Sequence, residues 1–514
     1  MTKKNEGPKF TSSLKWQSVN VSVQVILQLA FVAALARLIS PDAFGVMAIA
    51  LVVVGFIEIF AQVGIGPALI QNKAVEPRHR KTAFIFSLLL GVVFFIGTWL
   101  AAPTIASFYG NELLTDVLRW IALSFIISGA SVVPRSMLIK EMRFKSLFFC
   151  SASAMILGNL VIGLVLANSG FEIWAYVAAL LAQNTLLGIG YWISYPGPIG
   201  LKMDKESLKE MVGYGSRSTL FNMINYASGK IDTLIVGRYS GNWTFTGFYD
   251  RSSYLMGLPV TVLGKLGDSV LFSGLSMLQS QLEKLRKTVL QASHAISTLV
   301  IPLTILLIAR AENFTVVLLG EEYIEAVPTV EILFICVGLR SFIKIGDASM
   351  RATDKLKTGS FIKLGFFALL AIGVYYTIND SPTEYSAFEH TAYAVVLATA
   401  VQAVAIAVWL IVDLKIRTWD LIRTFIPGII LSVPVMLVQW KIEAGLVEDI
   451  WPMSESMVEL NHLITITIHI VLALVIAIFI VVLKPELIDG GMPEMRKKIF
   501  SKLPQTFITK KLSR

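Results

Sequence analysis

Long apolar runs separated by short polar segments fill almost the whole chain. Fourteen of these runs are long enough to cross a bilayer as helices, which takes about 20 residues. The pattern therefore predicts an all-α polytopic membrane protein with about fourteen transmembrane helices. The predicted spans are residues 15–38, 44–70, 83–107, 114–137, 147–168, 172–194, 209–238, 244–274, 288–310, 327–349, 359–379, 388–412, 421–440 and 461–483.

The charge of the connecting segments alternates along the chain. Every second connection is rich in Lys and Arg, whereas the intervening connections are mainly acidic and hold few basic residues. Basic connections stay on the cytoplasmic side of a membrane. The pattern predicts a multi-pass protein of a bacterial cytoplasmic (inner) membrane with both termini in the cytoplasm. The exceptions on the acidic side are Arg37, Arg238, Arg310 and Lys441.

Composition agrees with this interpretation. The chain has 514 residues, of which 55% are hydrophobic and 15% charged, and its mean hydropathy is +0.70. The net charge of +9 lies in short loops, so it does not indicate nucleic-acid binding. Cys150 and Cys336 lie inside apolar runs, and no cysteine or histidine spacing resembles a metal site. We therefore predict no metal, no cofactor and no catalytic residue, because the short loops leave no room for a catalytic domain.

The stretch from Met211 to Leu278 is unusually polar for a pair of membrane spans. Each charge at mid-membrane costs about 2.5–3.5 kcal/mol on insertion scales. Such side chains must therefore face one another or a water-filled cavity. The charged residues of this stretch include Arg217, Lys230, Asp232, Asp250, Arg251, Lys265 and Asp268.

Helical spacing places many of these polar residues on stripes. Positions spaced three and four apart lie on one helix face. One stripe is Ser218, Asn222, Asn225, Gly229 and Asp232, and the other is Asp250, Tyr254, Gly257, Thr261 and Asp268. A polar cavity explains the whole set of polar residues. Structural ion pairs are the alternative for two of the pairs, namely Lys230 with Asp232 and Arg251 with Asp250.

A weak internal repeat links the first and second halves of the chain. The segment ALARLISPDAFGVMAIA follows the first span, and LIVGRYSGNWTFTGFYDRS follows the seventh. Each contains an Arg, a turn, and then Phe and Gly at the start of the next helix. Parallel six-helix repeats are common among transporters.

Two groups of motifs stand out along the chain. The first group is Trp16, Arg37 to Gly45 and Gly64 to Gln71. The second is Asp232 to Gly237, Gly247 to Arg251 and Leu258-Pro259. Together these motifs resemble the polysaccharide transporter family, the Wzx-type flippases of the multidrug/oligosaccharidyl-lipid/polysaccharide (MOP) superfamily, with the WzxC-like exporters as the nearest subgroup. The likeness is clearest in the first 280 residues and continues as a helix count beyond them.

This resemblance implies two six-helix lobes around a central polar cavity. The lobes would be residues 1–200 and 201–415, followed by two additional helices in 416–484 and a basic cytoplasmic tail in 485–514. It also implies an undecaprenyl-diphosphate-linked oligosaccharide as substrate, flipped from the cytoplasmic to the periplasmic leaflet for lipopolysaccharide or exopolysaccharide synthesis. Partners would be membrane lipids and a polysaccharide polymerase or export machinery.

Candidate roles follow from the chemistry of that substrate. Arg and Lys bind diphosphate strongly at low dielectric, and we assign this role to Arg217, Lys230, Arg251 and Lys265. Arg340 and Lys344 come second, since Asp347 is a possible structural partner of Lys344. Amide, hydroxyl and aromatic groups suit sugars, and this set is Asn222, Asn225, Tyr226, Tyr254 and Thr261.

Energy coupling stays open at this point. No Walker A motif is present, so ATP hydrolysis by this chain is not expected. The remaining energy sources are the membrane potential, a proton gradient and a sodium gradient. Four carboxylates are candidates for binding a coupling ion, and each also fits a role as a structural counter-ion. They are Glu58, Asp250, Asp268 and Glu331.

Other functions predict different features. A drug or cation antiporter of the same superfamily predicts an acidic, aromatic site rather than a basic one. A peptidoglycan-precursor flippase predicts the same cavity charge as this chain. A membrane glycosyltransferase or polymerase needs large catalytic loops, and a purely structural scaffold leaves the intramembrane charges unexplained.

Overall fold

The structure is a computed structural model that describes residues 6–61, 65–72, 75–197, 203–209, 223–279, 281–381, 383–441 and 462–468. These residues form helices and no strand. Within these residues, eleven helices are long and apolar enough to cross a membrane. They correspond to the predicted spans one to six and nine to thirteen. The count of fourteen stays a prediction, since much of spans seven and fourteen lies outside the described residues.

The chain divides into two compact units. Unit 1 contains residues 1–251 and 370–388, and unit 2 contains residues 252–369 and 389–514. These units combine segments from different parts of the chain, whereas each predicted lobe is one continuous segment. The lobes stay a prediction. The unit boundary at Arg251 falls inside a continuous 35-residue helix, α12 (Trp243–Met277).

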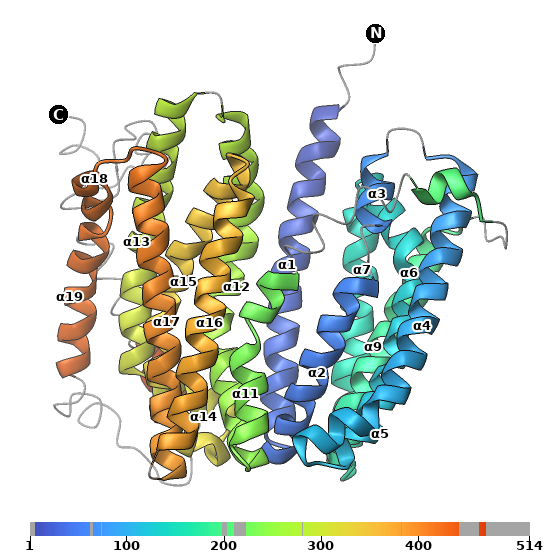
Figure 1. Cartoon of the computed structure of the whole chain (residues 1–514), viewed down its shortest axis with the longest axis horizontal. Helices are drawn as coiled ribbons and strands as arrows, with labels where there is room; N and C mark the ends of the chain where they lie inside the picture. The colour runs from blue at the N-terminus through green and yellow to red at the C-terminus, as the bar shows by residue number, and fades with distance from the viewer. Residues whose placement is uncertain are drawn as a thin grey trace. The chain divides into compact units, whose positions relative to one another are not determined.

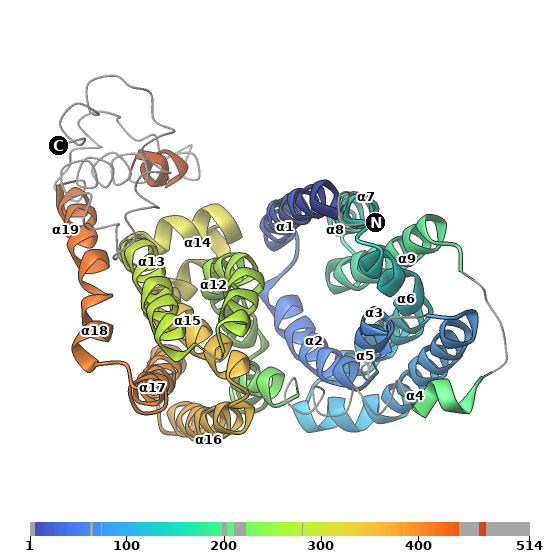
Figure 2. The same ribbon diagram turned by 90° about the horizontal axis from the view of Figure 1, so that it is seen from above.

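Unit 1 is a bundle of long helices with shorter connecting helices (Figure 1). Helix α4 packs against α6, α6 against α9, and α1 against α7, and Figure 2 shows these helices from above. The helices are α1 (Glu6–Ala36), α2 (Pro41–Ala61), α3 (Ile65–Gln71), α4 (Pro77–Tyr109), α5 (Leu113–Ile121), α6 (Leu123–Lys140), α7 (Phe144–Ala154), the π-helix η1 (Met155–Gly163), α8 (Leu164–Asn168), α9 (Glu172–Ser194), α11 (Ile231–Tyr239) and the start of α12.

The second predicted span, residues 44–70, is not one helix. It corresponds to α2, which ends at Ala61, and to the separate short helix α3. Pro67 lies in the first turn of α3, where the missing N–H of proline is tolerated. The sequence-based prediction merged two helices because both are apolar.

Helix α4 shows how a membrane helix is built here. Small residues line its buried face, and a Cβ on Gly91 would overlap the carbonyl oxygen of Phe125 in α6. Close backbone approach of this kind is typical of helix pairs in membranes. The opposite face exposes large apolar side chains to lipid: Leu89, Val93, Ile96 and Leu100. The chain is therefore a multi-pass membrane protein.

Unit 2 packs around α13 and α15, with α19 against the outer side of α13. Its core includes Phe342, Ile345, Ile406 and Trp409. The helices are the remainder of α12, α13 (Leu282–Ala309), α14 (Ala311–Leu319), the 3₁₀ helix η2 (Glu321–Ala326), α15 (Val327–Ala352), α16 (Leu356–Asp380), α17 (Glu384–Val412), α18 (Thr418–Arg423) and α19 (Ile426–Lys441); residues 370–388 of α16 and α17 belong to unit 1.

Candidate functional site

Arg251 and Asp250 form a buried ion pair at the end of unit 1. Arg251 donates from Nε to Asp250 Oδ2 over 3.1 Å, and a second, shorter bond comes from its terminal nitrogen. The guanidinium carbon lies 4.4 Å from the centre of the Phe44 ring, and both charged residues are at most 6% exposed. The ion pair between Arg251 and Asp250, which the sequence left open, is therefore formed.

Asp232 has local partners too. Its carboxylate accepts the Tyr249 hydroxyl over 2.8 Å and the Thr233 N–H over 2.8 Å. Lys230 sits at the N-cap position of α11 and is half-buried. Asp232 is thus held by a tyrosine of α12 through a hydrogen bond that the sequence did not predict.

Tyr226, predicted to contact sugar, reaches α2 instead. Its hydroxyl lies 3.3 Å from the carbonyl oxygens of Leu51 and Val52, to which it can donate. The space left by the absent side chain of Gly55 accommodates the ring. Glu58, a candidate coupling carboxylate one turn further along α2, is half-buried, and Asn225 is exposed. The Tyr226 hydroxyl therefore fixes the segment before α11 to α2.

Two cations in unit 2 lie on one face of α15, well inside a predicted span. Arg340 and Lys344 are four residues apart, so they share a helix face. Arg340 is half-buried and Lys344 is exposed. The Lys344 side chain lies beside Gly264 of α12, 3.9 Å from where a Cβ would be. Exposed Thr261 is one turn earlier on α12, so a basic and hydroxyl-bearing face is formed by α12 and α15.

Lys344 is not paired with Asp347. Asp347 accepts a 2.8 Å hydrogen bond from Lys363 of α16, and their side chains are 15% and 6% exposed. No carboxylate within the described parts of the chain pairs with Arg340 or Lys344. The structural pair of Lys344 with Asp347, which the sequence left open as an alternative, is therefore not formed, and the sequence analysis missed Lys363.

The remaining candidates are placed less fully. Tyr254 is half-buried on α12, and Glu331 is exposed in the first turns of α15. Lys265 and Asp268 lie in α12, but their side chains fall outside what the structure describes. Arg217 and Asn222 also fall outside the described residues. Asp250 belongs to unit 1, whereas Tyr254, Thr261 and Lys344 belong to unit 2.

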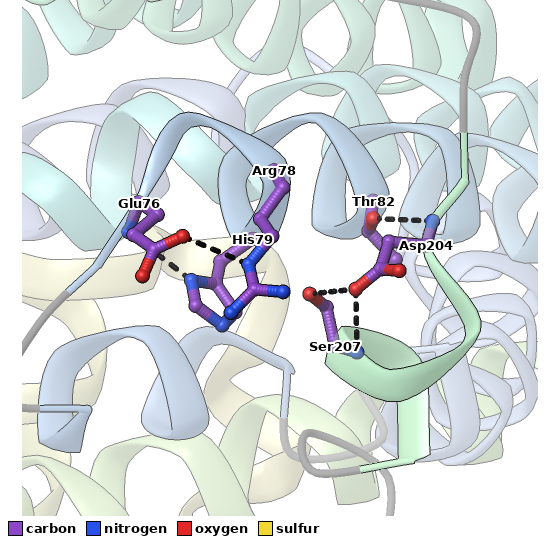
Figure 3. A network of polar contacts seen from close by, with 6 residues as sticks. All are labelled: Glu76, Arg78, His79, Thr82, Asp204 and Ser207. Atoms are coloured by element: carbon purple, nitrogen blue, oxygen red, sulfur yellow. Dashed lines mark hydrogen bonds and ion pairs between the residues drawn. The ribbon is translucent and has the colours of Figure 1, made fainter.

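A second polar network lies where the linker after α9 meets the start of α4 (Figure 3). The Asp204 N–H donates to Thr82 over 2.9 Å, and the Asp204 carboxylate accepts the Ser207 hydroxyl and N–H over 2.5 and 3.0 Å. The Ser207 hydroxyl bond, followed by its N–H bond, lowers the pKa of the Asp204 carboxyl. Beside it, His79 accepts the Glu76 N–H, and Arg78 pairs with Glu76 over 2.8 Å.

No metal site emerges from the part of the chain that the structure describes, since no three His, Cys, Asp or Glu side chains there come together. The face formed by α12 and α15 offers the cations of Arg340 and Lys344 and the hydroxyl of Thr261. Such a face is suited to an anionic, hydroxyl-rich ligand.

Comparison with known proteins gives one family model and several relatives. The model is described as "Polysaccharide biosynthesis protein" and matches residues 34–328. The chain is 25% identical over 366 residues to an uncharacterized membrane protein in the cps region of Klebsiella pneumoniae, covering 70% of this chain and 75% of the relative. It is 24% identical over 338 residues to the lipopolysaccharide biosynthesis protein WzxC of Escherichia coli, covering 65% and 68%.

Solved structures share the fold. The lipid II flippase MurJ in an inward closed conformation matches with a TM-score of 0.71 at 14% identity, covering 92% of this chain and 99% of that chain. An inward-facing multidrug MATE transporter of the MOP superfamily matches with a TM-score of 0.63 at 15% identity, covering 78% and 98%. The predicted all-α polytopic fold is confirmed.

Proposed function

Since this chain belongs to the polysaccharide biosynthesis protein family, we propose that it is a membrane flippase for lipid-linked polysaccharide repeat units. The resemblance to Wzx-type transporters noted in the sequence is confirmed by this membership. Relatives named for lipopolysaccharide, teichuronic acid and succinoglycan synthesis or transport support the same class of substrate. The fold shared with a lipid II flippase supports a transporter rather than an enzyme.

The observation that carries the proposal is the unneutralised charge on α15. Arg340 and Lys344 lie within a membrane span, and no carboxylate among the described residues pairs with either. A charge at that depth is costly unless it meets water or an anion. We propose that these two cations bind the diphosphate that joins the glycan to an undecaprenyl carrier.

Other parts of the predicted site complete this proposal. Lys265, Arg217 and Lys230 stay predicted diphosphate ligands, and Thr261 and Tyr254 stay predicted sugar contacts. Arg251 is engaged by Asp250 and Phe44, so it is not placed in the diphosphate set here. Glu58, Asp268 and Glu331 stay candidates for ion coupling, whereas Asp250 already neutralises Arg251.

The direction of transport follows from charge. We propose that both termini are cytoplasmic and that the substrate moves from the cytoplasmic to the periplasmic leaflet by alternating access. A diphosphate carries about two negative charges. Moving each charge outward across an inside-negative membrane is favourable by about 2.3 kcal/mol per 100 mV, so the potential assists export without ATP. The polymerase or export machinery that receives the glycan is a proposed partner.

The test is gene deletion followed by complementation. Without the protein, undecaprenyl-linked repeat units are expected to accumulate and surface polysaccharide to disappear. Arg340→Gln with Lys344→Gln is expected to fail in rescue, whereas Lys357→Gln, an exposed lysine at the start of α16, rescues fully. Normal lipid intermediates with raised sensitivity to toxic cations would instead support a drug antiporter, and accumulation of a peptidoglycan precursor would support a cell-wall flippase.

A further inference from the structure

An arginine held by aromatic rings lies at the acidic-loop end of unit 1. The guanidinium carbon of Arg238 lies 4.9 Å from the centre of the Phe108 ring and 5.5 Å from that of the Tyr239 ring. Tyr239 meets Tyr375 edge to face with ring centres 5.1 Å apart, and Tyr375 meets Tyr376 over 5.7 Å. Three helices far apart in the chain, α4, α11 and α16, therefore build one cluster of these five residues, which we call the Arg238 clamp.

The clamp lies where the apolar part of its helices ends. Phe108 and Arg238 are the last residues but one of α4 and α11, and Figure 1 shows these two helices ending at the same side of unit 1. On α16, exposed Ile372 is followed by the exposed ring of Tyr375 and then by exposed Asp380 at the helix end. Amphipathic rings such as tyrosine concentrate at the depth where lipid headgroups replace acyl chains. The clamp is therefore level with the headgroups of one leaflet.

The charge of Arg238 is open to an external anion. Arg238 is exposed, and no carboxylate in the described ranges of the chain forms an ion pair with it. The faces of the two rings attract the cation, but they do not replace the oxygen acceptors that the five N–H donors of a guanidinium bind. The rings hold the guanidinium in place, so less side-chain freedom is lost when an anion binds.

Arg119 is a neutralised counterpart in the same unit. Its guanidinium carbon lies 5.1 Å from the centre of the Trp99 ring of α4, and Trp99 is exposed, as Phe108 is. Asp116, three residues earlier on α5, approaches Arg119 within 3.9 Å. The two arginines thus share the contact with an exposed ring and differ in their counter-charge. Of the two, Arg238 is the one left to attract an anion from the membrane.

We propose that the Arg238 clamp binds the headgroup of an anionic phospholipid, such as phosphatidylglycerol, in the leaflet on the acidic-loop side. A guanidinium binds phosphate through two parallel N–H···O bonds, and the exposed tyrosine hydroxyls can donate to the glycerol of the headgroup. The acidic connections on this side repel negative lipids, so these lipids concentrate at Arg238. A zwitterionic headgroup adds an ammonium group, which Arg238 repels. The proposal does not depend on the proposed function, since the clamp belongs to unit 1 and the cations of α15 to unit 2.

The first test maps the lipid contact directly. The full-length protein is placed in phosphatidylcholine nanodiscs with a trace of phosphatidylglycerol that carries a diazirine on its headgroup, then irradiated and digested for mass spectrometry. We expect label on peptides that contain residues 105–112, 237–240 or 374–378. Arg238→Gln should lower that label roughly tenfold, because a charged hydrogen bond to the phosphate is lost. Arg119→Gln is the matched control and should label as the wild type does.

Three results would overturn the site. Equal label on these peptides in wild type and Arg238→Gln would leave an aromatic belt without a bound headgroup. Equal label from a phosphatidylcholine probe with the same diazirine would remove the preference for a negative lipid. Loss of the label on adding inorganic phosphate would assign the clamp to a free anion instead.

The second test uses stability and needs no probe. A ligand that binds the native state raises the unfolding midpoint by mass action. Phosphatidylglycerol added to phosphatidylcholine nanodiscs should therefore raise the midpoint of wild type and Arg119→Gln more than that of Arg238→Gln. Other lipid sites raise all three alike, and the midpoints in phosphatidylcholine alone show whether each variant is folded.

Phe108→Leu separates the ring from the charge. This variant keeps Arg238 and removes one of the rings that hold it, so its label and its midpoint shift should lie between those of wild type and Arg238→Gln. A midpoint shift in Arg238→Gln as large as in wild type would contradict the proposal, whatever substrate the protein transports.

Discussion

At the scale of single residues, charges inside the spans fall into two groups. Asp250 with Arg251, and Asp347 with Lys363, neutralise each other in buried pairs. Arg340 and Lys344 lie on one face of α15, and no carboxylate among the described residues pairs with either. Removing one partner of a buried pair is strongly destabilising, because the other charge is then left uncompensated. The first group is therefore expected to affect stability, and the second group transport.

Lys363→Met tests the structural group. The change leaves Asp347 buried without a counter-charge, which is expected to cost about 3–5 kcal/mol. The unfolding midpoint of the purified protein should fall accordingly. The double variant with Asp347→Leu removes both charges and should recover most of the loss. A double variant as unstable as the single one would show that the two charges are not coupled.

Asp204 gives a prediction about pH. Its pKa is depressed in the folded protein, mainly by the Ser207 hydroxyl. A carboxyl of this kind stabilises the fold above its unfolded pKa of about 3.9 and loses that effect as pH falls through the folded value. The difference in unfolding midpoint between wild type and Asp204→Asn should therefore be the same at pH 8 and pH 5.5 and should shrink below about pH 4. Exposed Glu206→Gln serves as the control, and a difference that changes between pH 8 and 5.5 would point to another group.

Residue identity alone did not reveal these partners. Asp250 and Arg251 are adjacent, so their pairing was among the interpretations that the sequence allowed. Lys363 was not, because its contact with Asp347 depends on how α15 and α16 are rotated about their axes. Spacing within one helix contains no information about rotation against a neighbour.

At the scale of helices, hydropathy predicted best those spans whose side chains are mostly apolar. The spans from α4 to α9 and from α13 to α19 are apolar enough to cross a membrane and were found at nearly the right bounds, although α15 carries Arg340, Lys344 and Asp347. Helix α12 is continuous over 35 residues and carries the buried pair of Asp250 and Arg251. The break between α2 and α3 was missed because both helices are apolar.

Glycine positions within one helix give a matched comparison. Gly91 of α4 lies against the backbone of α6, whereas a Cβ added to Gly97 of the same helix would meet no atom within 4 Å. Gly91→Ala should destabilise the protein by about 1–3 kcal/mol through overpacking. Gly97→Ala should be neutral or stabilise by up to about 1 kcal/mol, because alanine favours helix. Equal unfolding midpoints for the two variants would contradict the tight contact of α4 with α6.

At the scale of the whole molecule, loop charge predicts which side of the membrane each end of a helix faces. Cysteine in place of Lys357, in a basic connection, should be protected from impermeant maleimide in intact cells. Cysteine in place of Glu321, in an acidic connection, should react. Both positions are exposed at the start of a helix, so the difference reports sidedness rather than burial. The reverse labelling would place both termini outside.

The same sidedness determines how the membrane potential acts on transport. If the diphosphate crosses with about two negative charges, a potential of 100 mV contributes roughly 4.6 kcal/mol to outward movement. In proteoliposomes holding a lipid-linked glycan, a valinomycin-imposed potential, negative on the predicted cytoplasmic side, should accelerate flipping, and its reversal should slow it. Neutralising Arg340 and Lys344 should lower the rate at every potential, because substrate binding is lost before charge movement. A rate that follows a pH gradient and ignores the potential would instead assign the driving force to a proton-coupled carboxylate, with Glu58 and Glu331 the first to replace.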